Sequence, residues 1–138
     1  MPIITTSFNK ILVQRLGEAP SKNMKINNNV QIRDIAKADL NVGNMKQPAL
    51  RFEFEYKTEY LPKVAEIVMS GNMIYLTAAD KIESILNDWK KDKKAPKDIT
   101  TDVINNLLTR CNIEALLLSR EMGLPSPIPM PKVTAVKQ

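Results

Sequence analysis

The chain has 138 residues, of which 43% are hydrophobic and 25% are charged, a balance typical of a soluble globular protein with one core. It has no histidine, a single cysteine and four dispersed glycines, which excludes nucleophile–histidine pairs, a cysteine–histidine zinc site and a phosphate-binding glycine loop. The net charge of +5 permits a nucleic-acid partner. We therefore expect a single domain over residues 1–138 that is not an enzyme and holds no cofactor or metal.

No segment approaches the run of about 20 apolar residues that a membrane-spanning helix needs. The N-terminal sequence MPIITTSFNK lacks the charged segment and the continuous apolar segment of an export signal. We therefore expect the protein to be cytoplasmic and to have no membrane partner.

Two strands are predicted in the first third of the chain. Residues 3–16 carry apolar side chains on both faces, and simple alternation places Phe8 and Leu12 on one face and Ile11 and Val13 on the other. Residues 26–35 alternate more weakly. The three consecutive asparagines at 27–29 suggest a bulge or an exposed edge in this second strand.

Two further strands are predicted to pair as a hairpin. Residues 50–60 alternate between apolar and charged side chains, which is typical of a half-buried antiparallel strand. The apolar side is Leu50, Phe52, Phe54 and Tyr56, and the charged side is Arg51, Glu53, Glu55 and Lys57. Residues 64–76 are rich in β-branched and aromatic residues, and Gly71 marks a bulge or kink. The two glutamates are expected to form cross-strand ion pairs.

Two helices are predicted after the strands. Residues 78–93 follow a capping-box-like start at 77–80, and residues 98–122 end before Gly123, where a left-handed glycine commonly terminates a helix. Both carry apolar residues at one-face spacing. These are Ile82, Ile85, Leu86 and Trp89 in the first helix, and Ile104, Leu107, Leu108, Cys111, Ala115, Leu118 and Met122 in the second. The place of Cys111 on this stripe indicates a buried structural thiol.

Strands followed by helices predict an α+β fold, with a four-stranded antiparallel sheet and both helices packed on one face. The other face then needs a cover, a partner or a ligand. Prolines fall at every second residue from Pro125 to Pro131, which predicts an extended proline-rich tail over 124–138. This tail could pack along the body or serve as a docking strap.

Two sets of apolar residues are candidates for binding. Ile113, Leu116 and Leu117 form a second apolar patch on the long helix, which is either an oligomer interface or extra core. The other set is candidate client-binding surface or core, and sequence does not separate the two readings. Its members are Phe8, Leu12, Phe52, Phe54, Met69 and Met73.

Lysines cluster between the two helices and in the tail. The candidates for contacting nucleic acid are Lys90, Lys91, Lys93, Lys94, Lys97, Lys132 and Lys137. A solvated loop explains the run between the helices equally well, because a run of lysines carries no geometry of its own.

The order of elements, with the segments LLSREMGLP at 117–125 and PMPKV at 129–133, resembles the SecB export chaperone family. A Glu-Ala-Pro element at 18–20 is similar as well. The resemblance implies an oligomer, in that family a dimer of dimers, that holds unfolded polypeptides in apolar grooves between sheet and helices without hydrolysing nucleotide. SecB proteins are acidic and this chain is basic, so docking to the export motor is not implied.

Two functions follow from these features. The first is a SecB-like holdase that binds unfolded or nascent polypeptides without catalysis and forms a homo-oligomer when free. The second is a structural ribosome-associated protein that binds ribosomal RNA through its lysine clusters and C-terminal tail.

Overall fold

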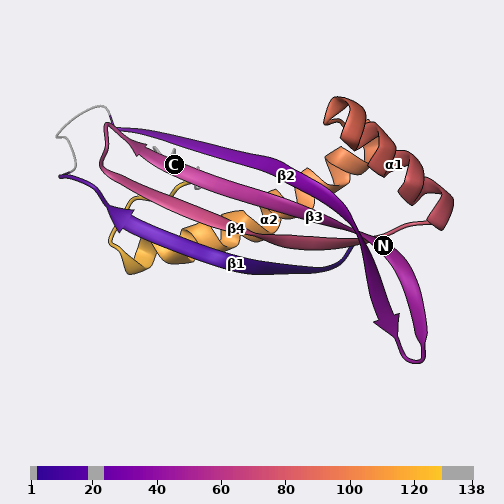
Figure 1. The fold of residues 1–138 in the computed structure, drawn as a ribbon. Helices are drawn as coiled ribbons and strands as arrows, with labels where there is room; N and C mark the ends of the chain where they lie inside the picture. Colours follow the sequence, from indigo (N-terminus) through magenta and orange to yellow (C-terminus); the bar gives the residue numbers. More distant parts are fainter. Residues whose placement is uncertain (1–2, 19–23, 129–138) are drawn as a thin grey trace, which may run out of the picture.

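A computed structural model of the chain describes residues 3–18 and 24–128, and it has the α+β order expected from the sequence (Figure 1). The strands are β1 (Ile3–Arg15), β2 (Lys25–Val42), β3 (Met45–Leu61) and β4 (Ala65–Leu76), followed by the helices α1 (Ala79–Asp92) and α2 (Lys97–Glu121). All strand pairs are antiparallel, in the order β1-β4-β3-β2. The sheet therefore has β1 at one edge and β2 at the other.

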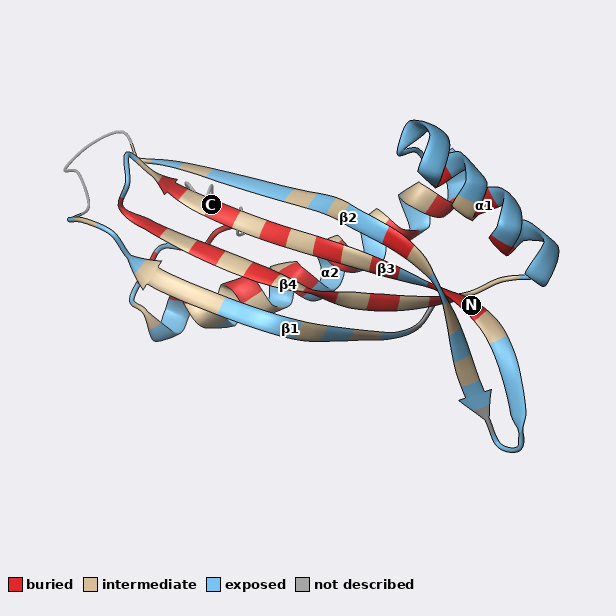
Figure 2. Cartoon of the chain, viewed as in Figure 1, coloured by how far each residue is buried: buried red, intermediate tan, exposed pale blue. Residues whose placement is uncertain are grey.

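The two central strands supply most of the core. On β3 the even-numbered residues from Leu50 to Tyr60 are buried, and on β4 the odd-numbered residues from Ala65 to Tyr75 are buried (Figure 2). This alternation confirms the expected hairpin and the expected inward side of residues 50–60. It also confirms the exposed or half-exposed position of the charged side, because successive side chains of a strand point to opposite faces.

The β2–β3 hairpin is longer than expected. Its strands continue to a two-residue turn at Gly43 and Asn44, where Gly43 has a φ of +63°. The sequence between 36 and 49 alternates too weakly to predict this extension. The expected bulge at the three asparagines is wrong, since residues 27–29 pair regularly with 57–59 and the irregularity falls between Ile32 and Asp34. The expected edge position of this strand is confirmed.

A bulge in β1 overturns the expected division of its faces. The register shifts between Phe8 and Lys10, so one extra residue reverses the alternation beyond this point. Phe8 and Val13 consequently both pack against the core, and Leu12 pairs with Val68 on the opposite face. Predicting Phe8 and Leu12 on one face was therefore wrong, and the reason is a local insertion that alternation alone does not reveal.

Gly71 lies directly across from this bulge. A Cβ atom built at Gly71 would lie 2.0 Å from the Ser7 carbonyl oxygen and 2.8 Å from the Cα of Phe8. The missing side chain lets the backbone of β1 approach β4 at this point. The bulge expected at Gly71 is therefore absent from β4 at this position. It occurs in β1, next to Phe8, which pairs with Gly71.

Helix α1 buries Ile82, Ile85 and Trp89, as its spacing predicted. The capping-box expectation is wrong, because Ala78 is the N-cap residue and makes no side-chain cap hydrogen bond. The helix ends at Asp92, and its C-cap residue Lys93 has a left-handed φ of 55°. A non-glycine residue in this conformation is uncommon.

Helix α2 lies across the sheet beneath the strands, as Figure 1 shows. Its buried residues follow a four-residue step: Ile99, Val103, Leu107, Cys111, Ala115 and Ser119. The predicted stripe omitted Ile99, Val103 and the polar Ser119. Its other predicted members are half-buried: Ile104, Leu108, Leu118 and Met122. The Ser119 hydroxyl donates to the Leu116 carbonyl, so its burial leaves no unpaired group. Gly123 has a φ of +64° and terminates the helix as expected. No helix within the described ranges is long and apolar enough to cross a membrane.

The described start of the tail packs along the body. The Tyr60 hydroxyl donates to the Pro125 carbonyl at 2.6 Å, and the Asn28 amide donates to the Pro127 carbonyl at 2.7 Å. Leu124 is buried in the core cluster. The rest of the predicted tail, 129–138, lies outside the described residues.

Candidate binding surfaces

Four of the candidate client-binding residues lie in the core. Phe52, Phe54, Met69 and Met73 have at most 1% of their surface exposed, so none of them reaches a groove on the surface. Phe8 is half-buried and packs edge-on against Phe54, with ring centroids 6.0 Å apart. Leu12 is also half-buried, but it lies on the sheet face away from the helices.

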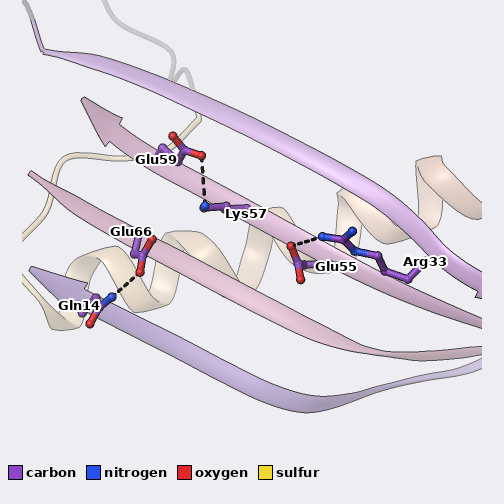
Figure 3. Close-up of polar contacts among 6 residues, drawn as sticks. All are labelled: Gln14, Arg33, Glu55, Lys57, Glu59 and Glu66. Atoms are coloured by element: carbon purple, nitrogen blue, oxygen red, sulfur yellow. Dashed lines mark hydrogen bonds and ion pairs between the residues drawn. The ribbon is translucent and has the colours of Figure 1, made fainter. Parts of the chain in front are cut away.

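The sheet face away from the helices is polar. Glu55 pairs with Arg33 at 2.8 Å, Glu59 pairs with Lys57 at 3.4 Å, and Gln14 donates to Glu66 (Figure 3). Glu53 lies 3.9 Å from Arg51. Glu55 therefore makes the expected cross-strand ion pair, with Arg33 on β2. The expectation is wrong for Glu53, whose partner Arg51 lies on the same strand. These pairs are solvent-exposed and contribute little to stability. This face carries a row of charged side chains along β3, with half-buried Leu12 and Val68 beside it.

The inner face contains a polar network that the sequence did not indicate. Asn28 on β2 accepts a hydrogen bond from the Thr58 hydroxyl at 2.7 Å, and its amide holds the tail. The Tyr56 hydroxyl lies 3.0 Å from the Asn112 side-chain oxygen on α2. Side chains from β2, β3 and α2 thus share one cluster with the tail backbone. Tyr56 and Thr58 are buried, so their hydroxyls need these hydrogen-bond partners.

A seam between β1 and α2 carries exposed apolar side chains. Two contacts align the elements: the Arg110 guanidinium lies 5.3 Å from the Phe8 ring centroid, and Arg15 donates to the Met122 carbonyl at 2.6 Å. Leu117 is two helical turns beyond Arg110 on nearly the same side of α2. Ile113 is one turn before Leu117, on the side of α2 that faces away from buried Cys111 and Ala115. Ile11, between Phe8 and Arg15, is 46% exposed, and Ile113 and Leu117 are 53% and 51% exposed.

This seam lies beside a free sheet edge. The sheet order leaves the outer side of β1 without a strand neighbour among the described residues. Leu116 is half-buried, so the predicted patch of Ile113, Leu116 and Leu117 divides into two exposed members and one shielded member. We call Ile11, Ile113 and Leu117 the β1–α2 seam. Within the part of the chain that the structure describes, all three side chains are apolar and about half exposed.

The lysines between the helices are all exposed. Lys93 reaches back over Trp89, with its ammonium 5.4 Å from the ring centroid, and the Trp89 indole donates to Asp34 at 3.1 Å. Within residues 3–18 and 24–128, none of the lysines between 90 and 97 forms an ion pair. Lys132 and Lys137 lie outside the described residues.

Two buried groups hold their protons tightly. Burial raises the pKa of the Cys111 thiol from 9.0 to about 12, as expected of a structural thiol with no exposed surface. Burial also raises the pKa of Tyr60 from 10.0 to about 12, with a further contribution from neighbouring Tyr56. The neutral, protonated form of each group is therefore the one the fold accommodates.

These two pKa values predict how stability changes in alkali. The unfolded chain loses the Cys111 proton near pH 9 and the Tyr60 proton near pH 10, whereas the folded chain keeps both until about pH 12. The free energy of unfolding should therefore be unaffected by these groups below pH 9 and should fall as the pH rises towards 12. Urea midpoints measured across this range check the fall. In Cys111→Ala its onset should move towards pH 10, and an unchanged onset would contradict the assignment to the thiol.

No protein-family model and no curated protein matches the sequence. Among solved structures, the chain is similar to a SecB-like chaperone of Mycobacterium tuberculosis, solved in complex with a ChAD peptide from an antitoxin. The two chains share 10% sequence identity, the match covers 98% of this chain and 91% of the other, and the TM-score is 0.48.

Proposed function

We propose that this chain is a non-catalytic holdase that binds unfolded or nascent polypeptides along the β1–α2 seam. The observation that carries the proposal is the coincidence of a free strand edge with exposed Ile11, Ile113 and Leu117. An extended polypeptide can add to an open edge through backbone hydrogen bonds, which are independent of sequence. Apolar side chains of the client would then lie on the apolar seam.

The bulge limits where such a client would pair. It divides the edge of β1 into the segment before Phe8 and the segment from Lys10 to Arg15. The second segment lies alongside the part of α2 that carries Ile113 and Leu117, because Arg15 contacts Met122 beyond them. We therefore expect a short extended segment of client to bind there, with apolar residues at every second position.

Aggregation of dithiothreitol-reduced insulin, followed by light scattering, tests the proposal. The wild-type chain should suppress aggregation with little dependence on salt, because the contact is apolar. The double variant I113D/L117D should lose most of the suppression while keeping its circular dichroism, since both side chains are half exposed. The matched control S84D/N87D adds the same charge at exposed positions of α1 and should suppress aggregation like wild type.

The same seam is where we propose that copies of this chain associate, so molar mass is measured in parallel by light scattering. Loss of suppression at unchanged mass assigns the seam to clients, and loss of both assigns it to self-association that supports client binding. A wild-type chain that fails to suppress aggregation, or an I113D/L117D variant as active as wild type, would refute the proposal.

A further inference from the structure

The loop between the helices encloses one side of a cavity of about 440 Å³. Its apolar lining comes from three elements: Ile32 on β2, Trp89 near the end of α1 and Ile104 on α2. The cavity is at the β2 side of the sheet, opposite the edge that carries the β1–α2 seam. It is therefore a separate surface, and its interpretation does not depend on the function proposed above.

Three cations surround this apolar lining. Lys93, Lys94 and Lys97 line the cavity and are exposed. They form no ion pair with any of the residues that the structure describes. The segment 90–97 contains five lysines and one aspartate, so it carries most of the net charge of +5. An apolar hollow with unpaired cations at its rim is complementary to a ligand that is apolar at its centre and anionic around it.

The geometry disfavours RNA as this ligand. Recognition of single-stranded RNA relies on stacking bases against exposed aromatic faces. Trp89 is only 9% exposed, and Lys93 lies over its ring. Its indole nitrogen already donates to the carboxylate of Asp34, so it is not free to bond to a base. A side chain entering the hollow instead meets the aliphatic groups of Ile32 and Ile104.

We propose that this cavity binds an acidic polypeptide segment through one bulky apolar side chain. That side chain fills the space between Ile32 and Ile104, and flanking carboxylates pair with Lys93, Lys94 and Lys97. The hydroxyl of Thr101, which also lines the cavity and is exposed, supplies a hydrogen-bond donor to the same segment. The charge of such a partner is opposite to the charge of this chain. The cavity selects it by the apolar side chain and the flanking carboxylates together.

Trp89 gives a direct readout, because it is the single tryptophan of the chain and lines the cavity. The probe is a capped, glutamate-rich peptide with one central phenylalanine and no tryptophan, titrated while Trp89 fluorescence is recorded. Binding should be saturable. Replacing the phenylalanine with alanine, or the glutamates with glutamines, should each weaken binding about tenfold or more.

A matched pair of lysine variants tests the site itself. The triple variant K93Q/K94Q/K97Q should weaken binding about tenfold, the sum of three modest charge pairs. The control K25Q/K37Q/K46Q removes the same charge from exposed positions on β2 and β3 that do not line the cavity, and it should change binding less than about twofold.

Three outcomes would overturn the proposal. The first is a titration with no saturable change in Trp89 fluorescence. The second is equal weakening by the two lysine variants, which would indicate general charge attraction. The third is an oligouridylate that displaces the peptide at comparable concentration and changes Trp89 fluorescence by itself, which would assign the cavity to RNA.

Discussion

Replacing Leu107 with alanine is expected to lower the free energy of unfolding by about 3 kcal/mol. Leu107 has no exposed surface and lies in the middle of the buried face of α2, within the single core cluster. Its truncation removes apolar contacts and leaves a cavity beneath the sheet, which the regular strands cannot fill by small movements. Urea unfolding followed by circular dichroism measures the loss.

Leu117 provides the matched control for this prediction. It is the same residue type on the same helix, but it is 51% exposed on the β1–α2 seam. Leu117→Ala should therefore cost only about 0.5 kcal/mol in an isolated chain. Equal costs for the two substitutions would mean that Leu117 is covered in solution, and a small cost for Leu107→Ala would mean that α2 buries a different face.

Replacing Gly71 with alanine is expected to cost about 3 kcal/mol or more, although it adds only one methyl group. That group would lie 2.0 Å from the Ser7 carbonyl oxygen and 2.8 Å from the Phe8 Cα, both of them backbone atoms that cannot turn away. Relief requires β1 to separate from β4 at the bulge. Thermal unfolding should show the lower stability, and faster amide exchange in β1 than in β3 should show where the sheet opens.

Gly43 is the matched glycine for this test. It lies in the turn between β2 and β3, where a Cβ atom would meet nothing within 4 Å. Its φ of +63° is accessible to asparagine, so Gly43→Asn should cost no more than about 0.5 kcal/mol. If Gly71→Ala proved as mild as Gly43→Asn, β1 would not approach β4 as closely as this structure places it.

The candidate sites were only partly predictable from the sequence. The run of lysines was visible in the sequence. The cavity that these lysines border also needs Ile32, which lies far away in the chain and reaches Trp89 and Ile104 only when β2 folds against both helices. The position of Ile113 and Leu117 off the main stripe of α2 left open whether they are interface or core, and the structure shows both to be exposed. The core assignment of Phe52, Phe54, Met69 and Met73 required knowing which sheet face the helices cover.

The amino-acid sequence by itself determined the number, type and order of the elements, the inward side of β3 and the glycine that ends α2, because each depends on periodicity or backbone conformation within one segment. The tertiary structure alone decided the bulge that turns Leu12 away from Phe8, the buried Ser119 and the network around Asn28. These features depend on which distant segment lies opposite each residue, and local patterns do not encode that pairing.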